Sequence, residues 1–145
     1  MNAPASKIAS IISGIPEHDI EDIKLTDITI RAGGGGTEED ARRELPEKEK
    51  DYPEPTMFGT TPAQAFYIRH ASGIEMSNIK VQSSGGDARP SFLLTDVRGA
   101  DFRFLQLPGR GKTPQFALNQ VRDFRVFRSK PVPDQELDSV ERQQL

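Results

Sequence analysis

The most constraining feature of this sequence is one segment that occurs three times between positions 66 and 128. When the copies are aligned on Phe66, Phe92 and Phe116, which are 26 and 24 residues apart, their apolar residues coincide. The matching columns that follow are Ile68/Leu94/Leu118, Ala71/Val97/Val121, Ile74/Ala100/Phe124 and Met76/Phe102/Val126. An internal repeat of this length indicates a fold built from stacked units, each of which buries its apolar face against its neighbours.

The spacing within each copy is that of β-strands. Apolar residues two apart, such as Phe66 and Ile68, fit a strand with one buried face. Gaps of three residues, such as Ile68 to Ala71, interrupt the alternation, as a corner between short strands would. We therefore predict an all-β fold, a right-handed single-stranded parallel β-helix of about four to five coils. A β-sandwich with regularly spaced short strands is the alternative, but it does not explain the match between columns.

The repeat also divides the chain, which we interpret as one domain over residues 1–145. The first coils occupy 6–31, because four apolar residues there match residues 51 positions later, namely Ile23, Leu25, Ile28 and Ile30 with Ile74, Met76, Ile79 and Val81. An inserted loop follows over 32–62, and the three repeated coils cover 63–130. Asp27 and Asn78 occupy equivalent places, which predicts a corner hydrogen bond from side chain to backbone. Residues 131–145 form a tail that we expect to be irregular or a short helix, because Pro131 and Pro133 end strand pairing.

The inserted loop opens with four glycines, Gly33–Gly36, which indicate a flexible exit from the repeats. They do not form a nucleotide-binding loop, because no Lys-Ser or Lys-Thr pair follows. Thr37 precedes three acidic residues, the pattern of a capped helix of one or two turns. A loop of this length inside a compact domain often carries function.

Composition excludes several functions. Only 34% of residues are apolar and the formal net charge is −3, so neither nucleic acid nor an anionic membrane is an expected partner. With no Cys and only His18 and His70, thiolate and histidine-rich metal sites are ruled out within one chain, and we expect no metal or cofactor. Residues 1–14 lack the charged start and long apolar core of a signal peptide, so as given the chain should stay where it is made.

Several short motifs resemble the C-terminal part of polygalacturonase-like glycoside hydrolases, glycoside hydrolase family 28, which are right-handed parallel β-helices. The motifs are Ile12-Ser13-Gly14-Ile15-Pro16 before Ile20-Glu21-Asp22-Ile23, Gly33–Gly36, Tyr52-Pro53-Glu54-Pro55 with Met57-Phe58-Gly59, Phe66-Tyr67-Ile68-Arg69-His70, Asp87-Ala88-Arg89-Pro90 and Pro131-Val132-Pro133-Asp134. Together they span nearly the whole chain, but they are structural motifs. The family's aspartate cluster, its Gly-His-Gly and its Arg-Ile-Lys are missing here, so the family's catalytic mechanism does not carry over. The resemblance implies a detached part of an exported enzyme.

Candidate site residues gather around the first copy of the repeat and the insertion. Alternation points Tyr67 and Arg69 outward, where Tyr could stack on a sugar and Arg could grip a carboxylate. The alternative is that Tyr67 packs under the insertion while Arg69 pairs with a Glu. The candidates for substrate binding are Tyr52, Tyr67 and Arg69. The weak catalytic candidates are Glu47, Glu49, Asp51, Glu54 and His70, of which the carboxylates are otherwise a solvated charged loop.

The sequence predicts a carbohydrate-active β-helix, either a small glycoside hydrolase or the remnant of one, that acts on or binds plant-type polysaccharide. The alternative is a non-catalytic structural or sugar-binding module, because hydrolysis needs two positioned carboxyl groups and the family's own pair is absent. The coil that contains Ile23 would expose apolar residues and unpaired strand backbone at its open side. We therefore predict a homo-oligomer, a trimer slightly ahead of a dimer.

Overall fold

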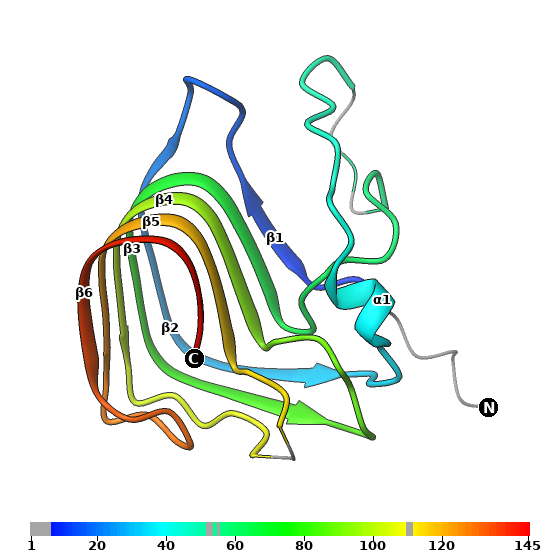
Figure 1. The fold of residues 1–145 in the computed structure, drawn as a ribbon, viewed down its shortest axis with the longest axis vertical. Coiled ribbons are helices and arrows are strands. Elements are labelled where there is room, and N and C mark those ends of the chain that lie inside the picture. The colour runs from blue at the N-terminus through cyan, green and yellow to red at the C-terminus, as the bar shows by residue number, and fades with distance from the viewer. Residues whose placement is uncertain (1–6, 52–53, 55, 110–111) are drawn as a thin grey trace.

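The computed structural model describes residues 7–51, 54, 56–109 and 112–145 and shows an all-β chain (Figure 1). Its elements are β1 (Ser10–Ser13), β2 (Ile20–Ala32), α1 (Glu38–Ala41), β3 (Phe66–Ser83), β4 (Phe92–Arg103), β5 (Phe116–Phe127) and β6 (Gln135–Gln144). The strands form one six-stranded sheet in the order β1-β3-β4-β5-β6, with β2 also on β3. Every pairing is parallel except that of β5 with β6. The prediction of an all-β, mainly parallel architecture is confirmed, and the arrangement is compatible with a β-solenoid.

The strand register follows the sequence repeat column by column. Phe66 pairs with Phe92, and Phe92 pairs with Phe116, so the three rings lie in one stack. Their centroids are 5.3 Å and 4.9 Å apart, with interplanar angles of 7° and 11°. All three side chains are buried, which confirms that this column forms the interior of the sheet.

The three-residue gaps in the sequence are corners made by residues with left-handed backbone. His70 (φ 51°) stands in the gap between Ile68 and Ala71, and Gly73 (φ 69°) stands in the next. The corners form three columns, which are His70/Asp96/Gln120, Asp22/Gly73/Gly99/Asp123 and Asp27/Asn78/Phe104/Arg128. One residue with left-handed backbone conformation bends the strand, while the apolar residues on both sides of it stay inside. Because of these bends, β3, β4 and β5 appear as nested arches in Figure 1.

The corner bond predicted for Asp27 and Asn78 is made differently from expectation. Both residues have the left-handed backbone conformation that a corner requires. The hydrogen bond, however, runs from Asn78 Nδ2 to Asp27 Oδ1 at 2.8 Å. The bond therefore joins two side chains on neighbouring strands rather than a side chain and the backbone. Stacking explains the difference, because equivalent corners lie one strand spacing apart, within reach of short polar side chains.

The insertion lies on one side of the arches, together with α1 (Figure 1). The predicted capped helix is present, because Thr37 Oγ1 accepts from the Asp40 amide at 3.0 Å and Asp40 Oδ2 accepts from the Thr37 amide at 2.9 Å. Part of the glycine run is packed, since Gly34 and Gly36 are buried while Gly35 is exposed. A Cβ atom at Gly36 would overlap the side chains of Asp87 and Arg89, so glycine is required there by close approach.

The prediction of an irregular or helical tail is wrong. β6 pairs antiparallel with β5 along its length, placing Leu137 opposite Phe124 and Val140 opposite Val121. The gap of three residues between Leu137 and Val140 mirrors the corner gap of the strand that β6 covers. Pro131 and Pro133 precede the strand, where their missing amide hydrogens do not interrupt its hydrogen bonds.

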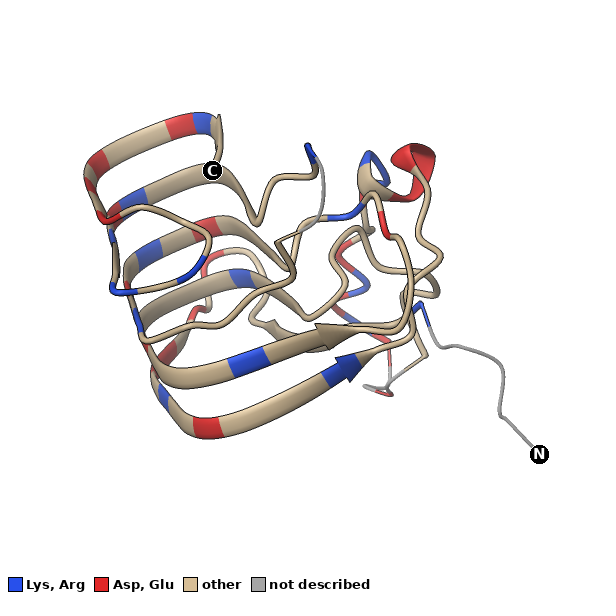
Figure 2. Cartoon of the chain, turned by 90° about the horizontal axis from the view of Figure 1, so that it is seen from below, with Lys and Arg blue, Asp and Glu red and all other residues tan. Residues whose placement is uncertain are grey.

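Charged residues are spread along several strands and the insertion rather than collected in one belt (Figure 2). Within the described residues, no helix is long and apolar enough to span a membrane. The apolar interior and the charged exterior follow from the same alternation that the sequence repeat shows.

Candidate functional site

The outward side chains of the first part of β3 are covered by the insertion. Tyr67 is 4% exposed and Arg69 is 3% exposed. The ring of Tyr67 belongs to a second apolar cluster formed between insertion and sheet, with Leu45, Phe58, Ala63 and Leu93. Tyr67 therefore packs under the insertion, as in the structural alternative above, and its burial raises the pKa of its hydroxyl.

Arg69 fastens the insertion to the sheet. Its guanidinium donates to the carbonyl oxygens of Leu45 at 2.8 Å and Pro46 at 3.1 Å. It lies 5.3 Å from the ring centroid of Phe58 and 5.5 Å from that of Tyr67. Its Nε also donates to Ser13 Oγ at 3.4 Å, and its Nη1 lies 3.7 Å from Glu47 Oε1, so each of the three nitrogens has a protein partner. The structure therefore gives Arg69 a structural role, and its contact with a sugar stays a prediction.

His70 joins two carboxylates at the edge of this covered region. Its Nδ1 lies 2.6 Å from Asp96 Oδ2, and its Nε2 lies 3.0 Å from both carboxylate oxygens of Glu47. Burial by itself lowers the pKa of His70, but the hydrogen bonds with Asp96 and Glu47 outweigh it, and the pKa is raised. The geometry fits an imidazolium that donates from both nitrogens, one to β4 and one to the insertion.

The remaining candidates do not join this cluster. Glu49, Asp51 and Glu54 are exposed on the insertion and do not line the groove described below. Tyr52 lies outside the described residues. Thus the structure brings together Glu47, Arg69 and His70, and it adds Asp96, which was not among the candidates from the sequence.

A groove of about 1510 Å³ runs from this cluster across the outer face of β4, β5 and β6. Its wall on the other side is the insertion, including Arg42 and Glu44. Three exposed arginines line its floor and side, namely Arg98 on β4, Arg122 on β5 and Arg142 on β6. No ion pair or hydrogen bond among the described residues engages their guanidinium groups, so they are available to a ligand.

Sequence reasoning missed these arginines, although a signal was present. Arg98 and Arg122 follow the aligned Val97 and Val121 and pair in register. Polar residues at equivalent outward positions of successive repeats are expected to line one surface. Arg142 could not be found in this way, because it belongs to β6, which was not predicted.

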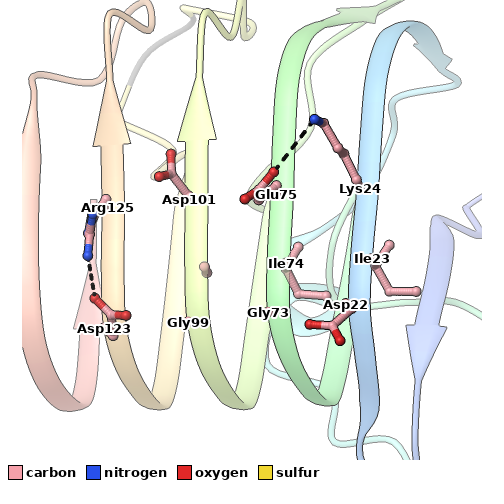
Figure 3. A pocket seen from close by; sticks show the side chains of 11 residues that line it. Asp22, Ile23, Lys24, Gly73, Ile74, Glu75, Gly99, Asp101, Asp123 and Arg125 are labelled. Atoms are coloured by element: carbon pink, nitrogen blue, oxygen red, sulfur yellow. Dashed lines mark hydrogen bonds and ion pairs between the residues drawn. The ribbon is translucent and has the colours of Figure 1, made fainter.

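A second, smaller depression of about 410 Å³ lies on the adjoining outer face, over the column of corner glycines (Figure 3). Gly73 and Gly99 leave the depression open, and Asp22 and Asp123 flank it. Ion pairs around it include those of Lys24 with Glu75 at 4.0 Å and of Arg125 with Asp123 at 3.3 Å. No group of three or more His, Asp or Glu side chains in the described part of the chain is placed to hold a metal ion.

The His70 bridge predicts a pH-dependent stability. Because the folded pKa of His70 is raised, its stabilising effect is full below the unfolded pKa of about 6.5 and is lost as pH rises through the folded value. His70→Gln should therefore lower the midpoint of thermal unfolding at acidic pH and lower it less at alkaline pH. Thermal unfolding of the wild-type protein and of His70→Gln at several pH values measures the difference between their midpoints. A midpoint difference that is equal at every pH would contradict the protonated bridge.

Comparison with known proteins gives no family for this chain, since no family model, curated protein or solved structure matches it.

Proposed function

We propose that this chain is a right-handed parallel β-helix that binds an extended, carboxylate-bearing polysaccharide in the groove beside the insertion. The observation that carries the proposal is the set of three exposed, unpaired arginines on adjacent strands, Arg98, Arg122 and Arg142. Arg98 and Arg122 are in register on adjacent parallel strands, about 4.8 Å apart, whereas Arg142 lies opposite Asn119 on the antiparallel β6. A groove that carries a positive charge on each of three neighbouring strands suits an extended polyanion. Guanidinium groups bind carboxylates with two parallel hydrogen bonds, which gives both charge and geometric selectivity.

The groove also offers uncharged polar contacts for hydroxyl groups. Thr95, Asn119 and Gln120 line it between the arginines and the insertion. The partly buried Ala117 and the edge of the largely buried Leu93 supply the apolar part of the lining on the same face. A binding surface with few placed polar groups and an apolar floor is the usual form of a small-molecule or oligomer site.

Hydrolysis is the second candidate function, favoured by one observation. Glu47 and Asp96 are two carboxylates held at one end of the groove by the same imidazole. Glycoside hydrolysis uses one carboxyl as proton donor and the other as nucleophile or base. Here both carboxylates accept hydrogen bonds from His70, so neither carboxyl group is placed by these contacts as the proton donor to a substrate. The geometry therefore supports binding better than turnover.

Binding is tested by titrating polygalacturonate into the protein and into Arg98→Gln and Arg122→Gln variants. Each variant should weaken binding by about ten- to a hundredfold, because a charge-assisted hydrogen bond contributes about 1.5–3 kcal/mol. Arg128→Gln is the matched control, since Arg128 is exposed but lies outside the groove, and its affinity should be unchanged. A neutral polysaccharide should bind weakly. Equal affinity of all variants would contradict the proposal.

The same samples distinguish binding from hydrolysis. Release of reducing ends from polygalacturonate or from chromogenic glycosides, abolished by Glu47→Gln and by Asp96→Asn, would favour the hydrolase. Retained binding without turnover would favour the non-catalytic module. Absence of any sugar binding would exclude both carbohydrate functions.

A further inference from the structure

The outer edge of β2 is uncovered over its whole length. On one side β2 pairs with β3 from Ile20 to Ala32, and no strand in the described residues pairs with its other side. The inward residues of β2 are only partly buried, whereas their partners in β3 are at most 4% exposed. The partly buried residues are Ile23, Leu25, Ile28 and Ile30. An edge with unpaired backbone groups and half-exposed aliphatic side chains is a template for a further strand.

The opposite end of the sheet shows how this fold covers such an edge. There β6 lies antiparallel on β5 and follows its corner, so that Leu137 and Val140 pack over Phe124 and Val121. Both strands of that pair stay in the sheet even though they run in opposite directions. An antiparallel strand is therefore an acceptable end to this stack of parallel strands.

We propose that the edge of β2 pairs antiparallel with β2 of a second copy of this chain, about a two-fold axis at Thr29. This register sets Ile28 opposite Ile30 of the second copy, and both side chains face inward. It also sets Asp27 opposite Arg31 of the second copy, and the symmetry makes each contact twice. The result is a closed dimer, the commonest form of homo-oligomer, rather than the trimer that the sequence favoured.

Charge complementarity selects this register. Asp27 is exposed, and its Oδ1 accepts from Asn78 at 2.8 Å, while no hydrogen bond or ion pair within the described residues engages its Oδ2. Arg31 is exposed, and no ion pair in the described part of the chain holds it. Registers centred instead on Asp27 or on Arg31 would set two like charges directly opposite each other, which is destabilising.

A charge exchange tests the pairing. Arg31→Glu sets a second carboxylate opposite Asp27 and should weaken self-association at least about tenfold, and Asp27→Lys should do the same with two positive charges. When the two variants are mixed, the introduced Glu of one copy faces the introduced Lys of the other. At the symmetry-related contact, the original Asp27 faces the original Arg31. Each contact then joins two opposite charges, so a mixed dimer should form. Lys24→Glu is the control and should leave the dimer intact, because Lys24 is on the same strand but outside the segment from Asp27 to Arg31 that makes the proposed contacts.

Sedimentation equilibrium measures the result against the chain mass of 16.1 kDa. The expected pattern is dimeric wild-type protein, two monomeric variants and a dimeric mixture. Monomeric wild-type protein at high concentration would overturn the proposal, and so would variants that stay dimeric or a mixture that stays monomeric. If Asp27→Lys fails to fold, hydrogen exchange of the wild-type protein tests whether β2 pairs with a second copy. Those amides between Ile28 and Arg31 that point away from β3 must exchange more slowly as concentration rises, and an exchange rate independent of concentration would overturn the pairing.

Discussion

Replacing Arg89 by Met is expected to lower the free energy of unfolding by about 3–5 kcal/mol, the range measured when one partner of a buried ion pair is removed. Arg89 is 1% exposed, and the Asp87 side chain beside it is equally buried. The guanidinium donates to Asp87 Oδ1 at 3.0 Å and to Oδ2 at 2.7 Å. Methionine would leave the Asp87 carboxylate buried without its counter-charge.

The same guanidinium also joins three separated segments of the chain. Its Nη1 donates to the carbonyl oxygens of Lys7 at 2.7 Å and Thr61 at 3.1 Å, while Asp87 packs against Gly36. Burial by itself raises the pKa of Asp87, but hydrogen bonds from Arg89 outweigh it and hold the pKa below its usual value. Loss of Arg89 should therefore loosen both ends of the insertion as well as destabilise the sheet.

Urea unfolding followed by circular dichroism measures the effect. Arg103→Met is the matched control, because Arg103 pairs with Asp101 at 2.9 Å on the surface, with 51% of its side chain exposed. Exposed pairs contribute about 0–1 kcal/mol, so the control should be nearly neutral. Similar losses in both variants would show that the buried pair has no special role. The double variant Asp87→Leu/Arg89→Met should be more stable than Arg89→Met, because it no longer buries an unpaired carboxylate.

The second large effect is expected at Phe92, in the middle of the aromatic stack. Phe92→Ala should destabilise the protein by about 3–5 kcal/mol, because it removes a fully buried ring and leaves a cavity. The ring contacts Phe66 and Phe116 at 5.3 Å and 4.9 Å and Phe102 edge-on at 5.1 Å. The cavity would therefore be shared by three repeats, and neighbouring rings cannot all move to fill it.

Phe127→Ala is the control for this substitution. Phe127 is only partly buried, and its ring faces the guanidinium of Arg103 at 5.6 Å rather than the interior. The same urea titration should show a loss several times smaller than that of Phe92→Ala. A larger loss at Phe127 than at Phe92 would mean that the aromatic column is not the centre of the core.

The fold was predictable where the sequence repeats itself. The Phe66 column and the three-residue gaps gave the parallel register and the corners, because stacking forces equivalent residues into equivalent environments. β6 was missed because it has no counterpart in the repeat and runs in the opposite direction. Its Leu137 and Val140 carry the corner spacing, but a spacing of three by itself does not distinguish a bent strand from a helix.

The site was less predictable, because it depends on how a non-repeating segment packs. Glu47 and His70 were candidates from the sequence, but nothing in it showed that both would meet Asp96. The burial of Tyr67 and Arg69 likewise follows from the placement of the insertion, through Phe58 and the carbonyl of Leu45. Contacts between a loop and a sheet distant in sequence are set by tertiary packing, which periodicity does not report.

In this fold, the residues that bend the backbone at the corners are different from the residues that fill the interior. A corner requires a left-handed backbone, and the chain meets that requirement with residues as different as Gly73, His70 and Phe104. The inward columns, in contrast, accept only apolar side chains of fitting size. His70 and Asp96, the pair at the end of the groove, both stand at corners. Mutation can therefore vary the chemistry displayed at the corners while the interior stays as it is, which gives such a chain a route to new activities that leaves its folding largely untouched.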